Sequence, residues 1–247
     1  MSVLVEICCC SVEDVIESEK GGAQRVELCS ALPLGGLTPS AGAISESKRL
    51  TSLPIIVMIR PRSGGFCYSE AELATMERDM DVAAEMGADG FVFGILCSDG
   101  TVDHRTSRLV KKAADLPTVF HRAFDVTPNP FEALEALIDL GITRLLTSGQ
   151  KPFSLAGAEL IKELVGRAEG RIEIMPGGGI RPHNVTDLLE ATGCRQIHLA
   201  AHRSILDSST AANPSIAFGS DSAPSEDHVD IIDSNVVAAV VKEANRQ

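Results

Sequence analysis

The most regular feature of the sequence is a repeated joint between a polar, helix-like stretch and a short apolar run. Four times a glycine ends the polar stretch and an apolar run follows within a few residues, in GGAQRVELC, GADGFVFGI, GITRLLTSG and GCRQIHLA. These glycines are Gly22, Gly87, Gly141 and Gly193. Because glycine readily adopts the left-handed conformation that closes many helices, the pattern predicts helices that lead directly into strands.

Four further apolar runs bring the predicted strands to eight. They are VLVEICC, PIIVMIRP, PTVFHRAFD and RIEIMPGG. Helical stretches separate the runs, among them residues 69–86, 103–114, 131–140 and 154–167. Regular alternation of strands and helices indicates a parallel sheet that is covered by helices.

Eight such units favour closure into a (β/α)8 barrel of the TIM type, as one α/β domain over residues 1–247. An open, doubly wound sheet is the alternative, although the glycine fingerprint of dinucleotide-binding sheets is missing after the first strand. The pattern becomes irregular in residues 203–226, which are rich in Ser, Ala, Asp and Pro, before a last helix near 231–245. We expect this excursion to be a mobile surface loop, or to order over the barrel mouth or against another subunit.

Composition narrows the range of partners. Lys and Arg total 22 against 34 Asp and Glu, so the formal charge of -12 repels nucleic acid and anionic membrane surfaces. Hydrophobic residues make up 44% of the chain and aromatic residues 4%, which suits a barrel core of aliphatic side chains. A few local basic residues can still hold a small anion, the candidates being Arg60, Arg62, His121 and Arg122.

The cysteines indicate a reducing compartment. There are seven, an odd number, with no CxxC pair and no regular disulfide spacing. The N-terminus enters a strand-like run without the features of a signal peptide, and no apolar run reaches membrane-spanning length. We therefore expect a cytoplasmic protein that binds neither nucleic acid nor membranes.

Nearly every predicted strand carries a polar side chain towards its carboxyl end, where core packing alone would select an apolar one. In barrels of this kind catalytic and binding groups lie at that end, and buried unpaired charges are costly. The pattern predicts a polar pocket at the barrel mouth, although any single member can equally form a structural salt bridge. The residues are Glu6, Glu27, Arg60, His121, Thr147 and His198.

The segment FHRAFD at the end of the fifth strand offers His121, Arg122 and Asp125 within five residues. Strand alternation sends His121 and Arg122 to opposite faces. We expect His121 to face the barrel axis and Arg122 to pair behind the sheet. In that position His121 serves as acid, base or metal ligand, or is a buried histidine that bonds to Glu6 or Glu27.

Two segments at the mouth predict an anion site. In IRPR, Arg60 and Arg62 have the same parity, so they can clamp a carboxylate or phosphate together, or pair with Glu27 on the adjoining strand. In MPGGGIRPHN, consecutive glycines allow backbone N–H groups to approach an anion. In LTSG, the side chains of Thr147 and Ser148 offer two hydroxyl donors to the same anion. The predicted anion-binding residues are Arg60, Thr147, Ser148, Gly177, Gly178 and Gly179.

The first two strands repeat one phrase, since VEIC ends in Cys8 and VELC ends in Cys29. Neighbouring parallel strands with equal spacing place the two thiols on one face at similar depth. Two adjacent thiolates suit a soft monovalent ion such as Cu(I). The alternative is that both are small core residues, and Cys9 and Cys10 are expected to be a packing position and a loop residue.

Several long phrases together resemble those of the CutC copper homeostasis family. They are VEICC, GGAQRVELC, GGLTPS, MIRPRSGGFCYS, FHRAFD, LTSGQ and MPGGGI, in order from Val5 to about His202. The resemblance implies a barrel fold, a cytoplasmic location, self-association with a dimer favoured, and copper handling through Cu(I). It also implies that the VEIC and VELC cysteines, here Cys8 and Cys29, bind the copper ion.

Two functions follow as hypotheses. In the first, Cys8 and Cys29 bind Cu(I) and the polar ring is mostly scaffold. In the second, the ring performs chemistry on a small anionic or phosphorylated metabolite, with His121 as acid or base and Glu6 or Glu27 as its partner. No organic cofactor is evident from the sequence, and a purely structural interaction scaffold is a third possibility.

Overall fold

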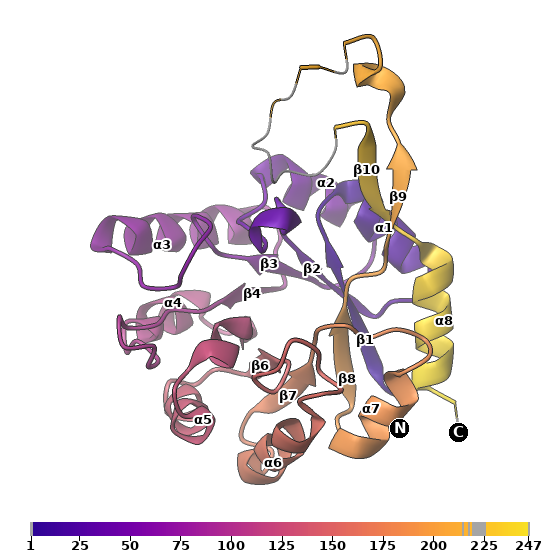
Figure 1. Cartoon of the computed structure of the whole chain (residues 1–247). Helices are drawn as coiled ribbons and strands as arrows, with labels where there is room; N and C mark the ends of the chain where they lie inside the picture. The colour runs from indigo at the N-terminus through magenta and orange to yellow at the C-terminus, as the bar shows by residue number, and fades with distance from the viewer. Residues whose placement is uncertain (1, 214, 217, 219–225, 247) are drawn as a thin grey trace.

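In a computed structural model, eight parallel strands surround one axis and helices surround the strands (Figure 1). The structure describes residues 2–213, 215, 216, 218 and 226–246. The sheet order is β7-β6-β5-β4-β3-β2-β1-β8, and an isolated parallel bridge between Gly177 and His198 links β7 to β8. The strands are β1 (Leu4–Cys9), β2 (Arg25–Leu28), β3 (Ile55–Met58), β4 (Gly90–Phe93), β5 (Thr118–Phe120), β6 (Arg144–Thr147), β7 (Glu173–Pro176) and β8 (Gln196–Leu199).

Eight α-helices, counted over the described part of the chain, cover the outside of the strands. Together with the strand order they confirm the predicted (β/α)8 barrel. None of the helices in these ranges is long and apolar enough to cross a membrane. They are α1 (Val12–Lys20), α2 (Ala41–Leu50), α3 (Glu70–Glu85), α4 (Thr106–Ala113), α5 (Pro130–Asp139), α6 (Ala158–Ala168), α7 (Val185–Thr192) and α8 (Ser234–Ala244).

The predicted helix-to-strand joints are present. The four glycines that mark them all have positive φ, from 73° at Gly193 to 94° at Gly87. Side chains also begin the helices: at α3, Ser69 accepts from the Glu72 N–H while the Glu72 carboxylate accepts from the Ser69 N–H. These local caps fix where each helix begins and ends, and therefore where the next strand begins. The carboxyl ends of the strands consequently come together at one end of the barrel.

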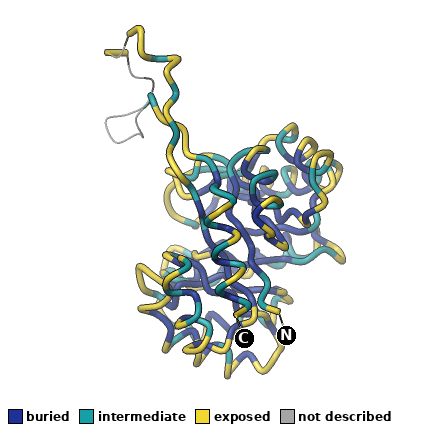
Figure 2. Tube along the Cα trace, turned by 90° about the vertical axis from the view of Figure 1, so that its right-hand side faces the viewer, coloured by how far each residue is buried: buried dark blue, intermediate teal, exposed yellow. Residues whose placement is uncertain are grey.

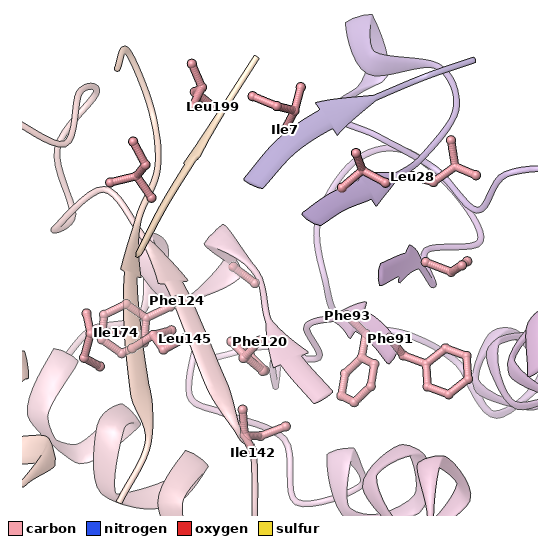
Figure 3. Packing of buried hydrophobic residues seen from close by; sticks show 14 of the residues in the cluster. Ile7, Leu28, Phe91, Phe93, Phe120, Phe124, Ile142, Leu145, Ile174 and Leu199 are labelled. Atoms are coloured by element: carbon pink, nitrogen blue, oxygen red, sulfur yellow. The ribbon is translucent and has the colours of Figure 1, made fainter. Parts of the chain in front are cut away.

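Two apolar layers hold the barrel together. The larger lies between strands and helices and includes the side chains labelled in Figure 3, such as Phe91, Phe120 and Leu145. Strand alternation sends the other set of side chains to the barrel axis. That inner cluster consists of Cys8, Cys29, Ile56, Met58, Val92, Val119, Leu146 and Met175.

Below the inner apolar cluster, the barrel axis is filled by a charged network. Glu6 pairs with Arg25, which also donates to the Gln196 side chain at 2.9 Å. Gln196 in turn donates to Glu173 at 3.1 Å, and Arg144 pairs with Glu173 at 2.7 Å. Glu6, Arg25 and Arg144 are buried, and each has a partner of opposite charge, which offsets the cost of removing it from water; Glu173 at the edge of the network is exposed.

The chain leaves the barrel after β8 in a hairpin. Strands β9 (His202–Leu206) and β10 (His228–Ile232) pair antiparallel, and the hairpin projects from the body as a mostly exposed arm (Figure 2). The predicted excursion at 203–226 thus begins in a strand, and 214, 217 and 219–225 lie outside the described residues. Its role as a mobile loop, a cover over the mouth or a subunit contact stays a prediction.

We expect Gly157→Ala to destabilise the fold and Gly166→Ala to leave it intact or stabilise it. A Cβ at Gly157, the residue before α6, would lie 2.0 Å from the Ser148 carbonyl oxygen and 2.8 Å from the Gly149 Cα, so backbone must shift. Such overpacking costs about 1–3 kcal/mol. Gly166 lies exposed inside α6 with nothing near its Cβ position. Alanine there should therefore raise the free energy of unfolding by about 0.5–1 kcal/mol. Urea unfolding measures both, and equal stability of the two variants would contradict this packing.

Candidate functional site

A pocket of about 350 Å³ opens at the carboxyl ends of the strands. Its floor is formed by side chains at the ends of β1, β2, β3, β6 and β8, and its walls by the loops that follow the strands. The volume suits a small molecule or an ion with a small ligand. The lining residues are Cys8, Glu27, Leu32, Gly35, Met58, Phe66, His121, Arg122, Ala123, Leu146, Gly178, Gly179, Arg181, His198, Leu199 and Ala200.

The two predicted thiols lie beside each other: Cys8 lines the pocket, and the buried Cys29 contacts it. Their Sγ atoms are 3.9 Å apart. The expectation of similar depth is wrong, because Cys8 is level with Glu27 and Cys29 lies two residues further along β2. Barrel closure requires neighbouring strands to be staggered, and here the stagger brings Cys8 within 3.9 Å of both the Glu27 Oε1 and the Cys29 Sγ.

Cys10 joins this pair as a third thiol. Cys10 lies in the loop after β1, as expected, and its Sγ is 3.4 Å from the Sγ of Cys29. Although β1 ends at Cys9, the chain keeps its alternation for one more residue, and the Cys10 N–H donates to Asp14 at 2.8 Å. The spacing of two residues between Cys8 and Cys10 was the sequence signal for a shared face.

One group of residues at the floor has the donors and the spacing of a metal site. Ligand atoms of Cys8, Glu27 and His198 all lie within 4.8 Å of one another, and all three residues are buried. The His198 Nδ1 contacts the Glu6 Oε1 at 2.8 Å, and this contact orients the ring. At many metal sites a carboxylate likewise bonds to the ring nitrogen of the histidine that does not bind the metal. Burial lowers the pKa of His198, but the Glu27 and Glu6 carboxylates outweigh it and raise that pKa overall.

Glu6 lies beneath the pocket and does not line it. It is 1% exposed and bonds to Arg25 and His198. Burial alone would raise its pKa, but these two partners outweigh burial and lower the pKa to about 2. Glu6 is therefore a permanent anion near neutral pH, and its predicted acid–base role stays a prediction.

Glu27 differs from Glu6 although both are buried. Burial raises the pKa of Glu27 to about 7, against a lowering effect of His198. Its Oε2 has no hydrogen-bond partner among the described residues, and the residue lines the pocket. A buried polar atom without a partner costs about 1–3 kcal/mol, so this carboxyl group is unsatisfied by the protein alone.

His121 faces the pocket, as predicted from alternation. Its Nδ1 accepts from the Ala123 N–H at 3.1 Å, which assigns the ring proton of the neutral form to Nε2. Burial, and next the nearby Arg60 charge, lower the pKa of His121 to about 3, so the ring is neutral. Nε2 has no hydrogen-bond partner in the described part of the chain. His121 is therefore a fixed hydrogen-bond donor, and its acid–base role stays a prediction.

The expectation that Arg122 pairs behind the sheet is wrong. Strand alternation ends after His121, whose backbone is still extended, because Arg122–Val126 form a short 3-10 helix. Arg122 consequently lines the pocket beside His121, and it donates to Asp125 at 2.8 Å and to the Ser148 hydroxyl at 2.7 Å.

The two arginines of IRPR do not act together. The Arg60 guanidinium donates to the carbonyl oxygens of Leu34, Gly36 and Gly64, whereas Arg62 pairs with Glu72 at the start of α3. Arg60 thus connects loops beside the pocket, and it forms no ion pair with Glu27 among the described contacts. Its predicted anion-binding role stays a prediction.

The remaining predicted anion-binding residues divide into two groups. The hydroxyls of Thr147 and Ser148 donate to Asp125, at 2.6 and 2.9 Å, and Gly177 bonds to the Thr147 carbonyl. Gly178 and Gly179 line the pocket with φ of 116° and 72°, values that favour glycine. Arg181, two residues further along GGGIRP, also lines it and was missed in the sequence, although the motif contains it.

Comparison with known proteins agrees with these features. The CutC family model matches residues 3–203. A CutC family protein of Treponema denticola is 48% identical over 98% of both chains. The mouse copper homeostasis protein cutC homolog is 44% identical over 93% of this chain and 85% of its own.

Solved structures give the same result. The crystal structure of CutC from Streptococcus agalactiae is 38% identical, with a TM-score of 0.76, and the match covers 80% of this chain and 98% of that one. Phosphoribosylanthranilate isomerase of Thermotoga maritima, at 13% identity and a TM-score of 0.58, shares the fold alone. By sequence and by structure, this chain belongs to the CutC family.

Proposed function

We propose that the protein binds Cu(I) through Cys8 and Cys29 and handles copper inside the cell. The observation that carries the proposal is the 3.9 Å separation of the two Sγ atoms, of which that of Cys8 belongs to a residue that lines the pocket. Two sulfurs at this spacing are within reach of one soft ion. Relatives from mouse and human are named copper homeostasis protein cutC homologs, which points to the same metal.

The surroundings of the thiols favour a soft ion over a hard one. The Cys10 Sγ is 3.4 Å from the Cys29 Sγ, and Met58 belongs to the same buried cluster, so further sulfur atoms lie close by. Glu27 and His198 approach Cys8 from the other side and offer the mixed ligands that Zn²⁺ accepts. We therefore assign the copper ion to the sulfur atoms. A titration with Zn²⁺ tests whether the mixed group of Cys8, Glu27 and His198 binds a metal instead.

Metal binding at this floor must release protons. A hydrogen bond from Cys29 lowers the pKa of Cys8, but burial and the Glu27 charge raise it to about 11 overall. Because the thiolate is the ligand, copper must displace the thiol proton. We expect the apparent affinity for Cu(I) to rise with pH between 6 and 8, as a chelator competition measures.

We expect Cys8→Ser with Cys29→Ser to abolish stoichiometric Cu(I) binding. Competition with a chromophoric Cu(I) chelator under anaerobic conditions measures the stoichiometry and the affinity. The control is Cys67→Ser with Cys97→Ser, which removes two thiols outside the floor and should retain one tightly bound ion. If the Cys8/Cys29 variant has the wild-type circular dichroism spectrum and still binds one Cu(I), this pair is not the copper site.

A cytoplasmic location and self-association belong to this proposal. All seven cysteines are free, as a reducing compartment would keep them. The hairpin offers a surface for a second subunit, since Leu206 and Val229 are exposed on it. Light scattering tests the dimer, and a monomer at micromolar concentration would reject it.

A second candidate is proton-transfer chemistry on a small anionic metabolite. It is favoured by Glu27, whose pKa of about 7 suits proton transfer near neutral pH. Glu27→Gln keeps the size of the side chain and removes that proton transfer, so it should abolish any such turnover while retaining the fold.

A further inference from the structure

Two buried polar atoms of the pocket have no partner in the described structure. One is the His121 Nε2 and the other the Glu27 Oε2, and both residues line the same cavity. Buried polar groups in folded proteins nearly always have a hydrogen-bond partner. Two exceptions in one open pocket indicate that a bound molecule supplies the partner.

The His121 side chain is fixed as a donor towards such a molecule. Its Nδ1 is occupied by the Ala123 N–H, and its ring packs against Phe66 with the centroids 5.0 Å apart. A Cβ at Gly94 would lie 2.4 Å from the ring Cε1, so the absence of a side chain at Gly94 makes room for this position. The ring therefore presents an N–H to a carbonyl or hydroxyl oxygen.

The pocket lining also contains cationic groups. Arg122 and Arg181 line the mouth, and Gly178 and Gly179 contribute backbone without a side chain between them. Arg122 is held in place by Asp125 and Ser148, which leaves it partly exposed towards the mouth. The lining residues include two arginines and one carboxylate, Glu27. In a chain of net charge -12, this local arrangement attracts an anion.

Apolar side chains also line the pocket, among them Leu146, Leu199 and Met58. A ligand with a short carbon chain contacts them without leaving polar atoms unpaired. A bare inorganic anion has no such chain.

We propose that this pocket binds a small organic anion, whose carboxylate or phosphate contacts Arg122, Arg181 and the Gly178–Gly179 backbone while a carbonyl or hydroxyl oxygen accepts from the His121 Nε2. The Glu27 carboxyl group contacts the same oxygen or its neighbour. This inference deepens the second candidate function by naming its ligand class, and it needs no copper. Binding rather than turnover tests it, so a failure of catalysis leaves it standing.

The test is calorimetric titration of the metal-free protein with three probes. Dihydroxyacetone phosphate carries a phosphate and a carbonyl, 2-oxobutanoate carries a carboxylate and a carbonyl, and inorganic phosphate lacks the second group. We expect one of the two carbonyl probes to bind at least tenfold more tightly than inorganic phosphate, and the preferred probe identifies the anionic group. Absence of binding by both at millimolar concentration, or equal binding of inorganic phosphate, overturns the proposal.

His121→Asn is the informative variant, because its Oδ1 can still accept from the Ala123 N–H while the Nε2 donor is lost. We expect about tenfold weaker binding of the carbonyl probe, as for loss of one hydrogen bond, and little change for inorganic phosphate. Arg122→Met should weaken every anion. Cys67→Ser, which changes an exposed cysteine outside the pocket lining, should retain the anion. Unchanged carbonyl-probe binding by a folded His121→Asn variant overturns the assignment.

Discussion

Glu6→Gln is expected to lower the free energy of unfolding by about 3–5 kcal/mol, the usual cost of breaking a buried ion pair. Glu6 is 1% exposed and lies between Arg25 and the His198 ring. Glutamine has nearly the same shape, so the effect comes from charge. It leaves the Arg25 guanidinium, itself 6% exposed, without a carboxylate partner in the barrel axis.

Urea unfolding of three variants checks this result. Glu46→Gln removes an exposed pair with Arg49 and should change the free energy of unfolding by less than about 1 kcal/mol. Glu6→Gln combined with Arg25→Met removes both charges and should recover part of the loss. A cost below about 1 kcal/mol for Glu6→Gln alone would mean that the barrel axis admits water to this network.

His121 is expected to make the protein less stable in acid. Its pKa is about 3 in the folded state against an ordinary value of 6.5, chiefly because it is buried and secondly because Arg60 is near. Between these values the unfolded chain binds a proton that the folded chain does not. The free energy of unfolding therefore falls as the pH falls below 6.5, by up to about 1.4 kcal/mol per pH unit from this group.

The comparison of wild type with His121→Asn isolates this effect. Glu6, with its lowered pKa, contributes stability that is lost as the pH falls from about 4.5 towards 2, whereas His198, with its raised pKa, contributes stability that is lost as the pH rises. Both contributions are common to the two proteins. Chemical unfolding at pH 7, 6 and 5 should give a smaller loss of stability for the variant, and parallel losses would show that His121 is not buried as a neutral ring.

The barrel itself was predictable because its determinants are local. Glycine after a polar helix and a short apolar run in Gly87–Phe93 specify a helix end and a strand whatever the rest of the chain does. Polar residues such as Glu27 and His121 stood out because a barrel strand otherwise selects apolar side chains. The structure places Glu27, His121 and Cys8 in the lining of one pocket, with Cys29 in contact with Cys8.

The partners of those residues were not predictable, because they depend on small offsets between strands. Glu6 and Glu27 occupy equivalent places in repeated phrases, yet the stagger of β1 against β2 puts Glu6 level with Arg25 and Glu27 level with Cys8. One becomes a permanent anion and the other a carboxyl group with a pKa of about 7. Arg122 was misplaced because the strand pattern was extended beyond His121, where the backbone is already a 3-10 helix.

For this protein, the order of apolar and polar residues by itself determined the eight strands, their helices and the end of the barrel at which the polar groups collect. Only the tertiary structure decided which group contacts which. The Cys29 thiol lies between those of Cys8 and Cys10, and Arg60 donates to backbone carbonyls. Arg122 lines the pocket together with His121. The physical reason is distance. Periodicity sets the face of a strand on which a side chain lies, whereas contacts of 3–4 Å depend on strand stagger and loop path, and pKa values follow from those contacts.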